Sequence, residues 1–425
     1  MAEIKIPFYT SSLPLHVEEP NLKAVITERS EEYDPGFNEE ELIRRAMAEP
    51  IGTEPLSSLA RGKKRVVVVT SDHTRAVPSR ITLPVILEEI RKGNPEADIT
   101  ILIATGLHRP TTPEEMRRMF GDAIVDNEKI AVNHAFEPDE FVDMGVLPSG
   151  SRFVVNRLAA DCDLLVTEGL IEPHFFAGFS GGCKSILPGV CSSETVNENH
   201  SYKAISHPNS TTGVIKGNPI HDDMVRAARM VNVQFICNVV LNSKKKVIGA
   251  FCGELELAHA RGVEFIESLS KCEKVTGDIV VTSNGGYPLD QNLYQSPKSA
   301  STAEACAGED GVIILCSSCC DGMGGVNFER VMTSGTIDEI DERLSRVPPP
   351  QTVSETWCVQ IFCRILKKHK MILVSQLEPS LVEKCGIIPA ASPDEALEKA
   401  YEIKGRGASV VVIPDGVAAL ITSKE

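Results

Sequence analysis

The stretch Arg65-Val-Val-Val-Val-Thr-Ser-Asp-His-Thr-Arg75 joins an unbroken β-branched run to a group of polar side chains. β-Branched residues favour strands, and a run that is apolar at every position is typical of a strand buried on both faces of a parallel sheet. The polar residues therefore stand where the strand ends. Since ligands of such sheets bind beyond the carboxyl ends of the strands, this stretch predicts both an α/β fold and the edge that carries the site.

Similar apolar runs recur along the chain, and polar loops or helix signals stand between them. The other runs lie at 99–104, 164–167, 279–282, 312–315 and 410–413. Thr112-Pro113-Glu114-Glu115 is a capping box with proline at the first helical position, and Asn218-Pro219 and Ser296-Pro297 begin two more helices. Strands that alternate with helices predict an α/β fold with mainly parallel sheets.

The chain has 425 residues, a length that favours two or three domains. A charged stretch from Glu267 to Lys274 separates two regions. We therefore predict an N-terminal α/β domain over residues 1–275 and a C-terminal α/β domain over residues 276–425. The last apolar run, near 408–415, could pair with the sheet of either domain.

The composition, with 42% hydrophobic and 24% charged residues, is typical of a soluble globular protein. A net charge of −16 argues against a nucleic-acid-binding protein, which would normally present a basic face. No apolar run reaches the roughly 18–20 residues that a membrane-spanning helix needs. The start, Met1-Ala-Glu-Ile-Lys-Ile-Pro7, has no apolar core of a signal peptide, so we predict a cytoplasmic protein that binds neither nucleic acid nor a membrane.

The 13 cysteines are scattered, with one cluster at Cys316-Ser-Ser-Cys319-Cys320. A CxxC pair can be redox-active or supply half of a zinc site. The sequence has no second CxxC and no HxxxH that would complete such a site. Reduced thiols, mostly buried, are the favoured interpretation, and the cluster receives no functional role.

A second informative stretch runs from Glu172-Pro-His174 through Phe-Phe-Ala-Gly-Phe-Ser-Gly-Gly-Cys to Lys184-Ser185. Its glycines allow backbone and ligand to approach closely. Lys184 can act as a nucleophile, a Schiff-base former or a phosphate ligand, and His174 can move protons. His200 is expected on a helix that begins near Ser193, with no histidine at metal-ligand spacing beside it. The stretch does not fit a P-loop, and no G-x-G-x-x-G follows a strand.

Other polar groups follow the predicted strands. Asp72 could accept from a ribose hydroxyl, and Arg75 suits a carboxylate or phosphate, although a salt bridge or helix cap at the strand end explains them equally well. His108 follows Thr-Gly-Leu at another strand end, where a structural histidine is the more common case.

Lys298 stands in the first turn of the helix that Pro297 begins, just after Tyr294 and Gln295. A cation there opposes the helix dipole, and a bound anion would offset this and collect free backbone N–H groups. A solvated lysine is the alternative. We therefore treat these residues as a candidate anion site.

Taken together, these segments resemble the lactate racemase family, nickel-pincer-nucleotide enzymes that act on 2-hydroxy acids. The matching segments occur in the right order over about half of the chain: Asp72-His73-Thr74-Arg75, Gly106-Leu-His108, Glu172 to Lys184, His200 and Gln295-Ser-Pro-Lys298. Trp357 is a looser match, because its neighbours are not diagnostic.

The resemblance implies two α/β domains with the active site in the cleft between them. It also implies a pyridinium-3,5-bisthiocarboxylic acid mononucleotide, linked to Lys184 as a thioamide, that binds nickel together with His200. Sulfur donors plus imidazole suit Ni(II). The implied cofactor-binding residues are Asp72, His73, Thr74, Arg75, Lys184, Gln295, Lys298 and Trp357. Arg75, Tyr294 and Lys298 are the predicted substrate-binding residues, and the enzymes that synthesise the cofactor are implied partners.

The implied reaction is racemisation or epimerisation of lactate or a related 2-hydroxy acid. The Cα hydrogen is too weakly acidic for acid–base catalysis alone, whereas hydride transfer to an electrophilic cofactor avoids a carbanion. His108 and His174 would take the hydroxyl proton, one for each enantiomer, with a 2-keto acid as the intermediate.

Three other functions fit part of the pattern. A pyridoxal-phosphate enzyme would use Lys184 for a Schiff base. A zinc enzyme would use His108, His174 and His200 as ligands. A non-catalytic nucleotide-cofactor carrier would bind the cofactor without exchanging the Cα hydrogen of any substrate.

Overall fold

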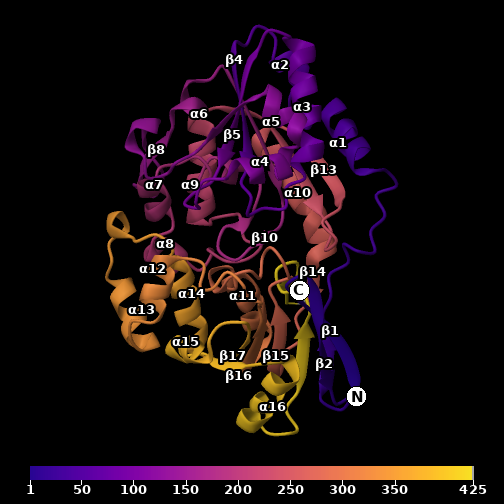
Figure 1. Ribbon diagram of the computed structural model, residues 1–425, viewed down its shortest axis with the longest axis vertical. Coiled ribbons are helices and arrows are strands. Elements are labelled where there is room, and N and C mark those ends of the chain that lie inside the picture. The colour runs from indigo at the N-terminus through magenta and orange to yellow at the C-terminus, as the bar shows by residue number, and fades with distance from the viewer. Residues whose placement is uncertain (424–425) are drawn as a thin grey trace.

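Two six-stranded sheets organise the part of the chain that the computed structural model describes, residues 1–423. In Figure 1 they belong to two units, one above the other, with most of the first half of the chain in the upper unit. Within each sheet nearly all neighbouring strands are parallel. The predicted α/β class with mainly parallel sheets is confirmed.

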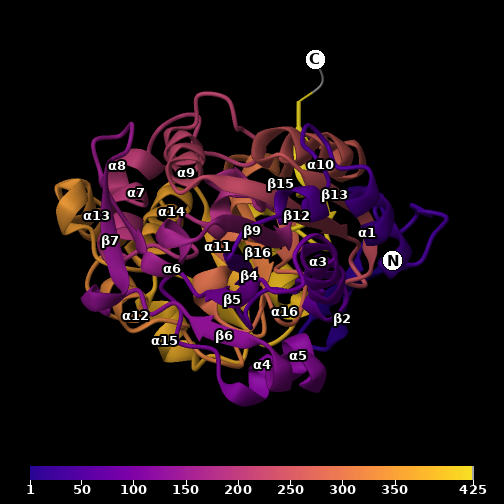
Figure 2. The ribbon, with the colours of Figure 1, turned by 90° about the horizontal axis from the view of Figure 1, so that it is seen from above.

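The upper sheet has the order β13 (Val247–Gly253), β12 (Val233–Leu241), β9 (Leu164–Leu170), β4 (Arg65–Ser71), β5 (Asp98–Ala104) and β6 (Lys129–Val132). Val66 and Val68 of β4 pack in the core that helix α3 (Ser79–Gly93) covers, whereas Val67 and Val69 pack in the core on the other face. Burial on both faces explains why this strand is apolar at every position. Seen from above, α1 (Glu39–Ala48) and α3 lie on one side of the sheet, and α7 (Ser193–Asn199) and α9 (Pro219–Met230) lie on the other (Figure 2).

The lower sheet has the order β18 (Ile388–Ala390), β17 (Lys370–Val374), β16 (Ala307–Cys316), β15 (Gly277–Ser283), β19 (Val410–Ile413) and β3 (Leu22–Val25). One face packs against α16 (Pro393–Lys404) and a hairpin of β1 (Ala2–Phe8) and β2 (Ser11–Val17). The other face packs against α11 (Pro297–Cys306) and α14 (Thr356–Leu366).

The first residues of the chain belong with the lower sheet, although the sequence analysis grouped them with residues 1–275. Strand β3 pairs with β19, and Ile6 and Leu15 of the hairpin are buried against lower-sheet residues such as Ile279. Figure 1 shows the indigo hairpin beside the orange and yellow elements of the lower unit. Hairpin burial and strand pairing thus join these residues to the lower sheet, while the domain bounds at residues 275 and 276 stay a prediction. The strand near 408–415 is β19, which pairs with β15 rather than with the upper sheet.

The remaining elements connect or flank the sheets. In the first part of the chain they are α2 (Leu56–Leu59), α4 (Pro113–Phe120), α5 (Asp122–Asn127), η1 (Pro138–Glu140), β7 (Phe141–Val146), β8 (Arg152–Asn156), α6 (Arg157–Asp161), β10 (Pro173–His174), β11 (Gly178–Phe179), η2 (Gly182–Ser185), α8 (Tyr202–Ile205) and α10 (Leu255–Ser270). Later elements are β14 (Lys271–Glu273), η3 (Leu293–Gln295), α12 (Val326–Met332), α13 (Ile337–Ser345), η4 (Pro349–Gln351), α15 (Pro379–Lys384) and β20 (Leu420–Thr422). None of the helices within residues 1–423 is both long and apolar enough to cross a membrane.

The local signals read from the sequence are found in the structure. All six predicted apolar runs are strands, namely β4, β5, β9, β15, β16 and β19. The capping box before α4 forms, since the Thr112 side chain accepts from the Glu115 backbone and the Glu115 side chain accepts from the Thr112 backbone. Proline begins α9 and α11 as predicted.

Each sheet reverses its strand order beside a strand that leads into a candidate loop. In the upper sheet β5 and β6 lie on one side of β4, and β9 and β12 lie on the other. In the lower sheet β16 lies on one side of β15, and β19 lies on the other. Ligands bind outside the carboxyl ends of the strands at such reversals. The loops after β4, β9 and β15 are therefore positioned to form a site.

Candidate active site

A cavity of about 160 Å³ lies where the loops after β4, β5 and β9 meet the segment after β15 and the start of α14. All but two of the residues predicted for the site line it. They are Asp72, Arg75, His108, His174, Lys184, His200, Tyr294, Gln295, Lys298 and Trp357. The cavity is thus built from both sheets, as expected for a site between two α/β domains.

The loop after β4 holds Asp72 in a buried hydrogen-bond network. One carboxylate oxygen accepts from the backbone N–H of Thr74 at 3.0 Å and from its hydroxyl at 2.6 Å, and the other lies 2.7 Å from Nδ1 of His108. Burial alone would raise the pKa of Asp72, but His108, Arg75 and the Thr74 hydroxyl outweigh it and hold the pKa well below its ordinary value. Asp72 is therefore an ionised partner of His108.

The network shows how the residues of this loop are arranged, and their assignment to the cofactor stays a prediction. The Asp72 carboxylate, which was predicted to bind the cofactor, is hydrogen-bonded to Thr74 and His108. The His73 ring turns toward Thr111, with Nδ1 3.2 Å from the hydroxyl, and Thr74 lines a neighbouring cavity. The side chains of His73 and Thr74 are thus not on the wall of the main cavity, since successive residues of a loop point in different directions. Arg75 is on that wall.

The segment after β9 brings both His174, on β10, and Lys184, on η2, to the cavity wall. Pro173–His174 pairs with Gly178–Phe179, and the backbone N–H of Ala177 donates to Nδ1 of His174 at 3.3 Å. Burial, reinforced by Lys184, Lys298 and Arg75, lowers the pKa of His174 well below its ordinary value, so the ring is neutral.

The glycines before Lys184 are required by close packing. Gly182 has a φ of +52°, and a Cβ there would lie 2.9 Å from the His259 ring. Its N–H donates to Oδ1 of the buried Asn238 on β12 at 2.7 Å. The Lys184 amine then reaches the cavity, where it lies 5.6 Å from the centre of the Phe176 ring. Burial and the nearby Arg75 lower the pKa of Lys184 to about 7, so about half of the amines are neutral and nucleophilic at neutral pH.

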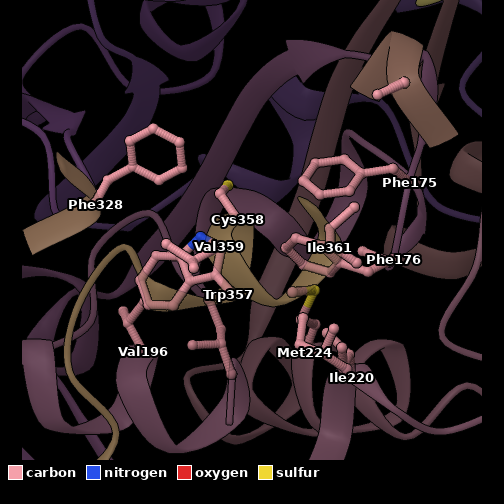
Figure 3. Close-up of a cluster of buried hydrophobic side chains, with 14 of the residues drawn as sticks. Phe175, Phe176, Val196, Ile220, Met224, Phe328, Trp357, Cys358, Val359 and Ile361 are labelled. Carbon is pink, nitrogen blue, oxygen red and sulfur yellow. The ribbon is translucent and has the colours of Figure 1, made fainter. Parts of the chain in front are cut away.

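His200 lies just beyond the end of α7, at its C-cap, rather than within the helix. Its ring contacts those of Phe176 and Trp357 edge-on, with 5.0 Å between the ring centres in both pairs. Figure 3 shows the apolar side chains of this region, including Phe175, Phe176, Val196, Trp357 and Cys358. Nδ1 of His200 is buried without a hydrogen-bond partner, and burial lowers the pKa of the ring to about 3. An unpaired neutral imidazole is the form that binds a metal.

The lower sheet contributes a cation and two hydrogen-bonded aromatic residues. Lys298 is buried in the first turn of α11, and burial together with Arg75 lowers its pKa to about 8. The indole N–H of Trp357 on α14 donates to the Tyr294 hydroxyl at 2.9 Å, and Gln295 lies beside them on the cavity wall. None of Arg75, Lys184 and Lys298 forms an ion pair with a carboxylate in the described chain, so the cavity suits an anion.

Comparison with known proteins places the chain among enzymes of one family. The family model for the lactate racemase N-terminal domain matches residues 8–213, and the model for the lactate racemase C-terminal domain matches residues 272–421. A lactate racemase from Thermoanaerobacterium thermosaccharolyticum is 44% identical over 427 aligned residues, which span 100% of both chains. The chain belongs to the lactate racemase family. A lactate racemase from Lactiplantibacillus plantarum is 42% identical over 99% of this chain and 100% of that one.

A solved structure of a lactate racemase has the same fold as this chain. The apoprotein structure of the lactate racemase from T. thermosaccharolyticum has a TM-score of 0.95 at 43% identity, covering 99% of this chain and 100% of that one. A protein from Thermotoga maritima has a TM-score of 0.68 at 18% identity, covering 91% and 98% of the two chains, and shares the fold.

Some residues of this lactate racemase family site were missed by the sequence analysis. Cys358 follows Trp357 on α14 and lines the cavity, so its position next to a predicted site residue was the available signal. Asn238, on β12, accepts a hydrogen bond from the backbone of the Lys184 loop, and no local sequence pattern predicts this contact. Cys316 and Cys319 are buried and Cys320 is exposed, and none of the three is in a disulfide bond within the described residues.

The side chains around the cavity decide whether the protein alone could bind a metal ion at this site. Among residues 1–423 there is no group of three or more His, Cys, Asp and Glu side chains arranged to hold a metal ion. A zinc site made by His108, His174 and His200 is therefore not present. A metal bound at His200 would need its other donors from a cofactor, and the free Lys184 amine and the unpaired His200 ring fit such a group.

Proposed function

We propose that this protein is an isomerase that interconverts the enantiomers of lactate, and that it carries the nickel-pincer nucleotide expected from its family. One observation carries the proposal: the residues that would do this chemistry line a single cavity. They are His108 and His174, Lys184 with its lowered pKa, His200 with Nδ1 free of hydrogen bonds, and the cations Arg75 and Lys298. Full-length identity of 42% and 44% to two lactate racemases supports the choice of substrate.

Lys184 and His200 are the proposed attachment points of the cofactor. The lowered pKa of Lys184 favours the neutral amine that a thioamide link requires, and the unpaired His200 ring would complete the nickel coordination. The cofactor would supply an electrophilic centre that accepts and returns a hydride. Enzymes that synthesise this cofactor are the proposed partners.

Arg75 and Lys298 would hold the substrate carboxylate, because both cations face the cavity without a carboxylate partner. Arginine binds carboxylates through paired N–H donors, and a buried lysine adds a charge-assisted bond. The Tyr294 hydroxyl, fixed by Trp357, would border the same region. Held at its carboxylate, the substrate can turn about its Cα–carboxylate bond and present either face.

His108 and His174 would handle the hydroxyl proton. With the hydride acceptor that the cofactor would supply, a histidine would take the proton from the hydroxyl oxygen as the substrate becomes a 2-keto acid. The keto acid would then turn to present its other face, and the oxygen would regain a proton. The Phe175 and Phe176 side chains, both buried beside His174, would keep water away from these steps.

The test uses enzyme produced together with the cofactor-synthesis enzymes. Enantiopure L-lactate and D-lactate, each deuterated at Cα, are incubated with it and analysed by chiral chromatography and mass spectrometry. We expect both to reach the racemate with deuterium retained at Cα, a mass adduct on Lys184, and nickel bound to the protein. Loss of deuterium to solvent, or a borohydride-reducible Schiff base at Lys184, would instead support the pyridoxal-phosphate alternative. Tight cofactor binding without racemisation of any 2-hydroxy acid would support the carrier.

A further inference from the structure

His108 and His174 have different hydrogen-bond partners at the same ring nitrogen. Nδ1 of His108 faces a carboxylate, whereas Nδ1 of His174 faces a backbone N–H. We propose that the two rings hold opposite neutral tautomers: His108 presents an acceptor nitrogen to the cavity and His174 presents an N–H donor. Asp72 and the Ala177 backbone amide are the positioning groups that set this difference. The functional consequence rests on the proposed racemase function, but the tautomers themselves do not.

The state of His108 follows from the partners of Asp72. An ionised carboxylate only accepts hydrogen bonds, so Nδ1 of His108, 2.7 Å away, must carry the proton. The Thr74 hydroxyl donates to Asp72 at 2.6 Å and can therefore only accept from Nδ1, from which it lies 3.3 Å away. With its proton on Nδ1, a neutral His108 leaves a lone pair on Nε2, which is what a proton acceptor needs.

The state of His174 follows from the Ala177 amide, which can only donate. Nδ1 of His174 accepts this hydrogen bond at 3.3 Å, so a neutral ring carries its proton on Nε2. An imidazolium would direct a second N–H toward the Ala177 N–H, and the three nearby cations oppose it as well. The ring is held by Phe175, stacked at 4.9 Å between ring centres, and by Phe176, edge-on at 4.6 Å.

The two histidines would therefore enter the reaction in different roles. An enantiomer whose hydroxyl lies against His108 can be oxidised directly: the O–H bond breaks and its proton forms an N–H bond at Nε2, while the hydride of Cα would go to the acceptor that the cofactor would supply. The resulting imidazolium is stabilised by Asp72. An enantiomer whose hydroxyl lies against His174 meets an N–H. Before that ring can accept, it must release the proton on Nε2, give up the Ala177 hydrogen bond and take a proton on Nδ1.

This difference appears in the rate of the first half-reaction and not in kcat/KM for racemisation. Lactate enantiomers have equal free energy, so kcat/KM must be equal in the two directions. In single-turnover experiments with cofactor-loaded enzyme in excess, we expect keto acid to form faster from the enantiomer that uses His108. The His174→Gln variant should keep this faster oxidation, and the His108→Gln variant should lose it.

The decisive test is nuclear magnetic resonance of the cofactor-free protein with ¹⁵N-labelled histidine at neutral pH. The His108→Gln and His174→Gln variants assign the two rings. We expect the protonated nitrogen to be Nδ1 in His108 and Nε2 in His174. Finding the same tautomer in both rings, or an imidazolium at His174, would overturn the proposal. The measurement needs neither cofactor nor substrate, so an inactive protein with opposite tautomers would contradict only the racemase function.

Two variants test the positioning groups. Ala177→Pro removes the amide N–H and should release His174 into a mixture of tautomers, while the matched Ala177→Gly keeps the N–H and the wild-type signal. Asp72→Asn should disturb His108 and leave His174 unchanged. An unchanged His174 spectrum in folded Ala177→Pro protein contradicts the role of the amide. If that variant does not fold, the wild-type and Ala177→Gly spectra still decide whether His174 carries its proton on Nε2.

Discussion

The two sheets bring the same kind of strand-order reversal to the cavity, but they supply different chemistry. The loops of the upper sheet carry His108, His174 and Lys184, side chains that can accept or donate a proton or form a covalent bond. The lower sheet carries Lys298 and the hydrogen-bonded pair of Tyr294 and Trp357, which present a cation and aromatic walls. This contrast suggests that the upper sheet performs the reaction and the lower sheet mainly holds the substrate.

Arg75 is an exception to this division between the sheets, because it belongs to the upper sheet but lies beside a cation of the lower sheet. It stands on an upper-sheet loop, yet its charge lowers the pKa of Lys298 on the lower sheet, so the two cations lie close together across the cavity. Neither forms an ion pair with a described carboxylate. A bound carboxylate would relieve the repulsion between them, which ties substrate binding to the meeting of the two sheets.

The largest expected effect comes from removing the proposed tether on the upper sheet. The Lys184→Ala variant should show no measurable racemisation and no mass adduct, because neither a thioamide nor another covalent link can form at residue 184. Lys203→Ala, which removes an exposed lysine, is the matched control and should behave as wild type. Intact-protein mass spectrometry and chiral chromatography check both. An adduct that persists in Lys184→Ala would place the attachment elsewhere.

The next effect concerns His108 and His174, the two histidines proposed to transfer the hydroxyl proton. His108→Ala and His174→Ala should each lower racemisation by about 10²–10⁴-fold, the usual contribution of a positioned acid or base. Both variants should keep the adduct on Lys184 and the bound nickel, since neither ring is proposed to hold the cofactor. Near-normal turnover of either loaded variant would remove that histidine from the mechanism.

A third expected effect is that the amine of Lys184 reacts faster at neutral pH than the amine of an exposed lysine, in protein without the cofactor. With its pKa lowered to about 7 from the ordinary value of 10.5, Lys184 should hold about a thousandfold larger share of neutral amine at pH 7 than a lysine in a model peptide. Because burial lowers this pKa, reactivity should appear as the pH rises through about 7. Reductive methylation followed by peptide mass spectrometry gives the rate at each residue. A Lys184 rate that rises only above pH 9 would contradict the lowered pKa.

Most of the strands that form the two sheets could be predicted from the sequence. Continuous apolar runs such as the one at 65–70 are strands because burial on both faces of a parallel sheet demands apolar residues at every position. The strand Leu22–Val25 was missed because it is short and lies at a sheet edge, and its partner β19 is almost 400 residues away in the chain. Pairing over such a distance leaves no trace in the local pattern.

The active site likewise has features that could be predicted from the sequence and features that could not. Glycine spacing and strand ends located the loops of His108, His174 and Lys184, since these features are local. The partner of each side chain was not predictable, because it comes from another segment: Asp72 binds His108 from a neighbouring strand, and Asn238 supports Gly182 from β12. The chemistry of individual residues was therefore readable, whereas the hydrogen bonds that set their protonation were not.

The smallest effect expected here tests the lower sheet. Lys298→Ala should raise KM for lactate about 10- to 100-fold, the equivalent of one charge-assisted hydrogen bond, and should change kcat less. The adduct on Lys184 should remain, which separates substrate binding from cofactor attachment. Lys298→Arg keeps a cation and should recover part of the loss, and Lys384→Ala, at an exposed lysine of the lower unit, should match wild type. A fall in kcat as large as that of the histidine variants, with KM unchanged, would mean that the lower sheet takes part in the reaction itself and that the division between the two sheets is wrong.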